Sequence, residues 1–174
     1  MKKMISFLDK KAIAGLRVGD EVFLTGIIYT ARDRAHKRLA EAIRKKERLP
    51  FNLKGAIIYY CGPAKTPKGR IIGSCGPTTS SRMDEFTLCL LEKGLKGMIG
   101  KGDRSGEVAA AIKKYKAVYF LTYAGCGALM ASYIRSAEVL AYQDLGPEAI
   151  YKLHVEKFPL IVAVDSKGRN IYKK

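Results

Sequence analysis

The sequence has few histidines and cysteines, and it lacks long apolar runs. It contains two histidines, four cysteines and no tryptophan in 174 residues. No apolar run approaches the ~20 residues that a membrane-spanning helix needs. The start, MKKMISFLDKKAIAG, lacks the long apolar core of a signal peptide. These absences predict a soluble, cytoplasmic protein with no membrane partner.

The four cysteines lack the close pairs that are typical of zinc and many iron-sulfur sites. Cys61, Cys75 and Cys89 follow one another at intervals of 14 residues, and Cys126 lies further along the chain. A disulfide framework is not expected in a chain without a secretion signal. We therefore expect reduced thiols that pack as small apolar side chains, and no metal bound by this chain itself.

Acidic residues are also scarce, and the 32 basic and 16 acidic side chains give a formal charge of +16. Such a charge suits nucleic acid, a small anionic substrate or an acidic protein partner. The basic residues are spread along the chain, with clusters at 32–48, 65–70 and 113–116. No aromatic platform for single strands and no finger spacing accompanies them. Charge alone does not decide between the three partners.

The hydrophobic pattern predicts alternating strands and helices. Apolar runs predict strands at 21–29, 55–60, 71–74, 97–100 and 117–122. Helical spacing predicts helices at 31–49 and 106–115, another that includes Met83, Phe86 and Leu90, and a turn into a helix within 124–134. The end, 158–172, reads as a strand, a Ser-Lys-Gly turn and a returning strand. The prediction is one α/β domain over residues 1–174, with mixed strand directions.

The stretch SCGPTTSSRMD, residues 74–84, combines four hydroxyl side chains with an arginine directly after a predicted strand. Gly76 and Pro77 turn the chain, which predicts that residues 78–81 form the first turn of a helix. The free N–H groups of such a turn favour an anion, and Thr78 and Arg82 would share one helical face. An ordinary capped helix with a solvated arginine is the alternative interpretation.

Other catalytic motifs are missing, but cations recur after strands. There is no GxxxxGK[ST] or GxSxG motif, and His36 in a polar helix is more typical of a solvated residue than of a general base. Arg32, Arg82 and Lys101 each follow a predicted strand. Such corners converge on a ligand crevice in open α/β sheets. Three cations there suit a small dianion better than nucleic acid.

Four segments carry a family resemblance, in the same order as in the family: YTARDRAHKRL (29–39), CGPTTSSRMD (75–84), MIGKGD (98–103) and DLGPEAIYKLHVEKFPLIVAVDSKGRNIY (144–172). They resemble the C-terminal or β part of the iron-sulfur-dependent class I fumarase and L-tartrate dehydratase family, over nearly the whole chain. The resemblance implies a single swivelling β/β/α domain, with a mixed sheet flanked by helices.

The resemblance also implies the site and its partners. Thr78 matches the residue proposed as catalytic base, and Arg32, Arg82 and Lys101 match residues that bind the substrate carboxylates. Thr79 and His36 adjoin these positions, and the role of His36 stays open between support of the site and structure. A [4Fe-4S] cluster would be bound by a separate α subunit, in a heterotetramer of two α and two β chains.

The function implied is that of a hydro-lyase β subunit, active only with its α subunit. Interconversion of fumarate and (S)-malate is the first expectation, and conversion of L-tartrate to oxaloacetate is the alternative. A basic nucleic-acid-binding module remains a hypothesis of another class, although we expect no nucleic-acid partner. Thr78 poses a chemical difficulty, because only the alkoxide form of its side chain would be a strong enough base. An alcohol is far too weakly acidic to lose its proton at neutral pH without help.

Overall fold

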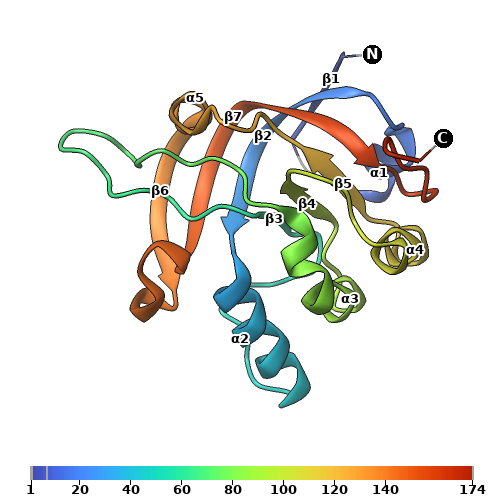
Figure 1. Cartoon of the computed structure of the whole chain (residues 1–174), viewed down its shortest axis with the longest axis horizontal. Helices are drawn as coiled ribbons and strands as arrows, with labels where there is room; N and C mark the ends of the chain where they lie inside the picture. Colours follow the sequence, from blue (N-terminus) through green and yellow to red (C-terminus); the bar gives the residue numbers. More distant parts are fainter. Residues whose placement is uncertain (1, 7, 174) are drawn as a thin grey trace.

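The computed structural model describes residues 2–6 and 8–173, which form a mixed sheet with helices packed on it (Figure 1). The strands are β1 (Lys2–Ile5), β2 (Glu21–Thr30), β3 (Ile57–Tyr59), β4 (Gly97–Gly100), β5 (Val118–Leu121), β6 (Ile134–Ala141) and β7 (Ile150–Val164). The α-helices are α1 (Lys10–Gly15), α2 (Asp33–Arg44), α3 (Asp84–Glu92), α4 (Gly106–Tyr115) and α5 (Gly127–Ser132). Two 3-10 helices are η1 (Ser80–Met83) and η2 (Gln143–Glu148). Among the described residues, no helix combines the length and the hydrophobicity that a membrane span requires.

The sheet closes on itself through its longest strand. Strands β1 to β5 are parallel neighbours in chain order. Strand β7 runs antiparallel to β5 on one side and to β2 on the other. The pairings of β2, β3, β4, β5 and β7 therefore form a closed circuit, which we call the strand ring. Strand β1 is attached outside it to β2, and β6 is attached to β7.

Alternate side chains of the ring serve two apolar cores. Ile57 and Tyr59 of β3 enter a core that receives residues from all five ring strands, and therefore fills the inner face of the ring. Ile58 points the other way, into a second core beneath α2, α3 and α4. Strand β3 is consequently buried on both faces, as expected for parallel strands covered on both sides. In Figure 1 these three helices gather on one side of the sheet.

Most of the predicted elements are confirmed. Strands are present at four of the five predicted positions, with ends that differ by one or two residues, and α4 has the predicted bounds. Helix α2 is shorter than predicted, because it ends at Arg44 rather than continuing toward Pro50. The mixed strand directions and the helices flanking the sheet confirm the α/β class.

Two predicted strands are wrong. Residues 71–74 form no strand but belong to a connection, residues 62–74, which we call the arm and which is exposed at 64–71. The Ala64 N–H donates to the Ser74 carbonyl oxygen at 2.9 Å, so the two sides of the arm bond to each other rather than to the sheet. The returning C-terminal strand is reduced to one bridge between Val164 and Asn170. The Asp165 carboxylate accepts backbone N–H groups from Lys167 and Arg169 there, which holds a turn.

The pattern also gave no indication of β1, of β6 or of the first half of β7. Strand β6 is an edge strand with exposed polar residues such as Arg135 and Glu138, so its sequence lacks a continuous apolar run. Its backbone is held by antiparallel pairing to the first half of β7. That partner lies beyond the 3-10 helix η2, and local periodicity does not report it.

Gly100→Ala should destabilise the fold, because Gly100 ends β4 against the buried side chains of Ser80 and Tyr60. An added Cβ would overlap Ser80 Oγ and lie 2.9 Å from Tyr60 Cδ2. Overpacking of this kind costs about 1–3 kcal/mol. Urea unfolding measures the loss, with Gly15→Ala as the control, since a Cβ at Gly15 meets nothing within 4 Å. Equal stabilities of the two variants would contradict the packing argument.

Candidate functional site

The candidate site residues lie where three parallel strands end. Arg32 comes two residues after β2, and Lys101 directly follows β4. The N–H of Thr78 donates to the carbonyl oxygen of Tyr60, just beyond β3, at 2.7 Å. Because β2, β3 and β4 are parallel, these positions share one edge of the sheet, the edge at which α/β sheets bind ligands.

The hydroxyl-rich stretch precedes its helix rather than forming the first turn. Thr79 pairs with Lys101 as a parallel bridge, and the Ser80 N–H donates to the Lys101 carbonyl oxygen at 2.9 Å. The backbone N–H groups of Thr78 and Ser80 are therefore used by strand ends. The prediction that residues 78–81 make one helical turn is wrong, since η1 begins at Ser80 and α3 at Asp84. Thr78 is half-buried and Thr79 is exposed.

Arg32 and Arg82 are brought together by a carboxylate between them. Arg82 Nε donates to Asp33 Oδ1 at 2.8 Å, and Arg32 Nε lies 3.8 Å from Asp33 Oδ2. Glu148, from η2, lies against the same atom of Arg32, with 3.4 Å between Oε1 and Nε. The base of the arm packs here as well, because a Cβ on Gly62 would lie 2.9 Å from Arg32 Cδ. We call these four charged side chains the arginine–carboxylate cluster.

His36 is buried on α2, so the expectation of a solvated histidine is wrong. Its Nδ1 lies 2.9 Å from the carbonyl oxygen of Arg32, which can only accept, so Nδ1 carries the proton. Burial lowers the pKa of His36 to about 4, with a further contribution from the positive charge of Arg104. His36 is therefore neutral at neutral pH, and it fixes the backbone of Arg32 at the start of α2.

Arg104, which the sequence did not single out, braces the corner that carries Lys101. Its side chain is fully buried, and its guanidinium lies between the rings of Tyr60 and Tyr119, 5.4 and 5.0 Å from their centroids. Its Nε donates to Asp84 Oδ1 at 2.6 Å, which pairs the buried charge. The Tyr119 hydroxyl is hydrogen-bonded to Ser80 Oγ at 2.9 Å. These contacts join the start of α3, β5 and the loop after Lys101 into one unit.

The cysteines do not gather as ligands of a cluster. Cys61 and Cys75 are buried in the inner core of the ring, and burial raises the pKa of the Cys61 thiol. This confirms the packing interpretation for these two, whereas Cys126 is exposed and does not pack as predicted. Within residues 2–6 and 8–173, no group of three His, Cys, Asp or Glu side chains could hold a metal ion. The residues present therefore do not fit an iron-sulfur cluster.

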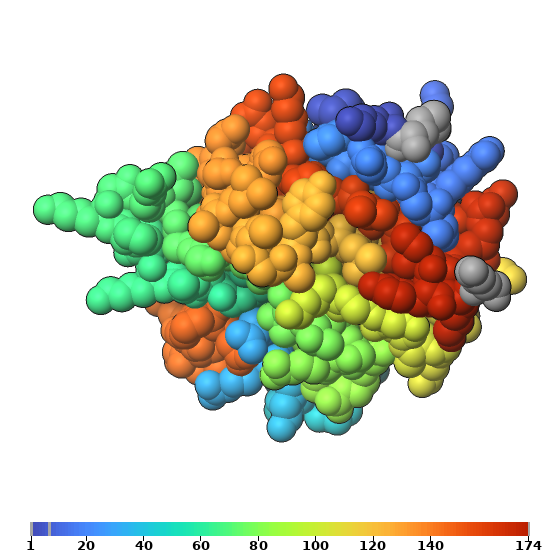
Figure 2. Space-filling view, turned by 45° about the horizontal axis from the view of Figure 1, so that its top comes forward, coloured from blue at the N-terminus to red at the C-terminus, as the bar shows by residue number. Residues whose placement is uncertain are grey.

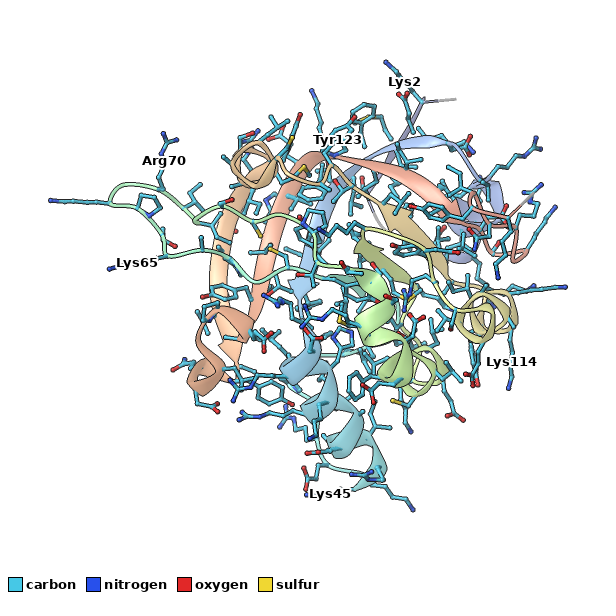
Figure 3. The ribbon with its side chains drawn as sticks, in the orientation of Figure 1. Lys2, Lys45, Lys65, Arg70, Lys114 and Tyr123 are labelled. Atoms are coloured by element: carbon cyan, nitrogen blue, oxygen red, sulfur yellow. The ribbon has the colours of Figure 1, made fainter. Side chains whose placement is uncertain are left out.

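The arm protrudes from the body of the molecule. Residues 64–71 are all exposed, and the segment stands out from the body in green in Figure 2. It carries Lys65, Lys68 and Arg70 and no acidic residue. Figure 3 shows Lys65 and Arg70 pointing away from the body, while Lys2, Lys45 and Lys114 point outward from other sides. The positive charge is thus distributed around the molecule and is not confined to one face.

The sequence contained a signal for part of what it missed. Asp33 stands inside the RDRAHKR segment, adjacent to Arg32, so it could have been included with the site. Glu148 is brought to Arg32 only by the path of the chain between β6 and β7. Arg104 lies in a polar GKGDRSG run that reads as a solvated loop, and no local pattern shows that it is buried.

Acidic pH should destabilise the fold through His36. Its pKa is about 4 in the folded protein against an ordinary 6.5, so the unfolded chain takes up the proton first as the pH falls. The stabilising contribution of neutral His36 is therefore complete above pH 6.5 and is lost as the pH falls toward 4. Linkage makes the total about 3 kcal/mol. The free energy of unfolding, measured with urea at several pH values, should fall more steeply between pH 6.5 and 4 for the wild type than for His36→Gln. Equal pH dependence in the two proteins would contradict a neutral, buried His36.

Comparison with known proteins gives consistent matches over the whole chain. The sequence model of the family described as Fumarase C-terminus matches residues 3–174. A Methanocaldococcus jannaschii protein provisionally named L(+)-tartrate dehydratase subunit beta is 39% identical over 180 residues, which cover 100% of this chain and 92% of that protein. L(+)-tartrate dehydratase subunit beta of Escherichia coli is 35% identical over 177 residues, which cover 98% of this chain and 87% of that protein.

A second group of relatives is much longer than this chain. Fumarate hydratase 2 of Leishmania major is 42% identical over 159 residues, which cover 90% of this chain and 28% of that protein. The chain therefore spans most of the length of the beta subunits but less than a third of that fumarate hydratase. The match over nearly every residue shows that the chain belongs to the Fumarase C-terminus family.

Proposed function

We propose that this chain is the β subunit of a hydro-lyase that adds water to, or removes it from, a dicarboxylate, with fumarate and (S)-malate as the first candidate pair. The observation that carries the proposal is the shared sheet edge, at which Arg32, Thr78 and Lys101 follow β2, β3 and β4 and Arg82 is joined to Arg32 through Asp33. Residues 1–174 would act as a single domain within the complete enzyme.

In this proposal the cations bind the substrate carboxylates. Arg32 and Arg82 use their Nε atoms toward Asp33, and among the described residues no hydrogen bond engages their terminal Nη groups. Guanidinium ends of this kind bind carboxylates with two parallel hydrogen bonds. Removal of the proton beside a carboxylate builds negative charge, which Lys101 and the arginines would stabilise. Thr79 and His36 would support these residues, Thr79 through its bridge to Lys101 and His36 through the Arg32 carbonyl.

Thr78 is proposed as the group that moves the proton. Its N–H is held by the Tyr60 carbonyl oxygen at 2.7 Å, which fixes its backbone at the sheet edge while its side chain remains half-buried. A hydroxyl needs a positive environment to act as a base at neutral pH. The cations proposed to bind substrate would supply part of that environment, and the α subunit would supply the remainder.

L-tartrate, converted to oxaloacetate, is the second candidate substrate. The observation that favours it is length, because the two beta subunits that match over nearly their full lengths are named for L(+)-tartrate dehydratase. The fumarate hydratases, in contrast, show the higher identity of 42% but are far longer. The same arginines would bind either diacid, so turnover has to decide between them.

The proposal includes an α subunit that carries a [4Fe-4S] cluster, in a heterotetramer of two α and two β chains. Two relatives are named as beta subunits, which favours a partner chain. The cysteines of this chain do not fit the cluster. When bound by the partner, the cluster would supply Lewis-acid chemistry at the substrate hydroxyl.

Turnover should require both chains. Co-expression with the α subunit and anaerobic reconstitution should give activity on fumarate and malate, or on L-tartrate, while this chain alone should give none. Initial rates with the three substrates measure this and rank the two candidates. A reconstituted complex that contains its cluster but turns over none of them would refute the proposed function.

Thr78→Ala should lower kcat by at least about a hundredfold, the lower end of what a positioned proton-transfer group contributes. Assembly with the α subunit should be unaffected, because the backbone hydrogen bond from Thr78 to Tyr60 remains possible. Ser81→Ala is the matched control, since it removes an exposed hydroxyl from the same segment. Similar rates for Thr78→Ala and the wild type would exclude Thr78 as the base.

The nucleic-acid hypothesis can be tested by the salt dependence of binding. The basic side chains labelled in Figure 3 face different directions, which does not favour a single nucleic-acid surface. A nucleic-acid module would bind DNA or RNA with an affinity that falls steeply as salt rises. Weak binding that is unchanged in Arg82→Ala, together with binding of a dicarboxylate, would leave only the hydro-lyase proposal.

A further inference from the structure

Buried polar atoms without a hydrogen-bond partner are concentrated at one place. Within the described ranges 2–6 and 8–173 they are Arg32 Nε, Asp33 Oδ2, His36 Nε2 and Glu148 Oε2. All four belong to the arginine–carboxylate cluster or to the histidine that fixes Arg32. Buried polar groups are normally satisfied, so a group of exceptions at one site calls for an explanation. The charged side chains of the cluster therefore do not form all the hydrogen bonds that they could form with one another.

Asp33 has a special place in the cluster because one carboxylate faces both arginines. Its Oδ1 accepts from Arg82 Nε at 2.8 Å, and its Oδ2 lies 3.8 Å from Arg32 Nε. Glu148 faces Arg32 alone, at 3.4 Å. Both contacts of Asp33 are made to Nε atoms, and no hydrogen bond among the described residues engages the Nη groups of the two arginines.

Asp33 is itself held firmly. It is the first residue of α2, directly after Arg32, and the Arg32 carbonyl oxygen accepts both the His36 N–H at 2.8 Å and His36 Nδ1 at 2.9 Å. Arg82 comes from a different element, the 3-10 helix η1, and its side chain is 52% exposed. A half-exposed arginine would sample many rotamers, so the bond to a fixed carboxylate restricts it.

We infer that Asp33 is a positioning residue that orients Arg82 and Arg32 together, so that their Nη groups face the two carboxylates of a dicarboxylate. This inference rests on the proposed function for its substrate. Asp33 need not touch the substrate, because it acts through the two guanidinium groups. Asp33 Oδ2 and Arg32 Nε form an ion pair at 3.8 Å without a hydrogen bond. Asp33 Oδ1 therefore fixes Arg82 more firmly than Asp33 Oδ2 fixes Arg32.

Positioning and simple electrostatics predict opposite results for Asp33→Asn. Removal of a negative charge beside an anion site should tighten substrate binding if repulsion is the main effect of Asp33. Loss of the charge-assisted bond to Arg82 should weaken binding if orientation is the main effect. The sign of the change in KM therefore separates the two.

In the reconstituted complex, Asp33→Asn should raise KM for the dicarboxylate about tenfold while kcat changes by less than about threefold, since about 1.4 kcal/mol of binding is lost. Asp33→Asn placed on an Arg82→Lys background should raise KM much less, because its partner is already altered. Asp144→Asn is the matched control. It loosens another exposed arginine–carboxylate pair, the bidentate one with Arg38, which lies outside the cluster, and should leave KM unchanged.

A second measurement works on this chain alone. In the wild type the Arg82 Nε–H should exchange slowly with solvent and give its own resonance in 1H–15N spectra, because it donates to a carboxylate. Asp33→Asn should accelerate that exchange at least about tenfold, and Asp144→Asn should not. This readout reports orientation of Arg82 without requiring turnover.

A KM that falls or stays the same in Asp33→Asn would overturn the inference, as would unchanged exchange of the Arg82 Nε–H. If the wild-type complex turns over no diacid, the proposed function fails. The exchange measurement still decides whether Asp33 orients Arg82. The positioning role is supported if Asp33→Asn raises KM and accelerates exchange of the Arg82 Nε–H, and if the increase in KM is smaller on the Arg82→Lys background.

Discussion

The structure depends on one strand, β7, being paired on both sides. Its second half bonds to β5 and to β2 at once, which turns an open sheet into the strand ring. Closure gives the ring an inner face that five strands fill, so no edge of β2 or β5 is left to solvent along those pairings. The parallel ends of β2, β3 and β4 are thereby held at fixed spacings, and Arg32, Thr78 and Lys101 inherit those spacings from the backbone.

The sheet edge carries two arginines of different kinds, one buried and one partly exposed. Arg104 is fully paired and stacked, so it acts as a rigid brace between α3, β5 and the loop after Lys101. Arg32 is loosely paired and partly exposed, so it keeps hydrogen-bonding capacity. A fully satisfied arginine stabilises a corner, whereas an arginine with unused donors is suited to recognise a ligand. The contrast separates structural from recognition charges without reference to a substrate.

Sequence patterns predicted the parts of the fold that local periodicity controls. Strands at β2, β4 and β5 and helix α4 follow from apolar runs, and Arg32 and Lys101 could be selected because each follows such a run. The backbone of Thr78 could not be predicted, since its N–H bonds to the end of β3 rather than to a helix. Glu148 and Arg104 were missed because their environment is created by segments distant in sequence, and β6 because an edge strand carries polar residues.

The arm has a further consequence for how such chains can vary. Its exposed residues, 64–71, take part in no strand pairing of the described sheet, while its two ends are anchored at Gly62 and Ser74. Insertions, deletions or a proteolytic cut between those anchors would leave the register of every strand unchanged. The length and sequence of residues 65–71, within its exposed part, can therefore change while the backbone that carries Thr78 stays in place.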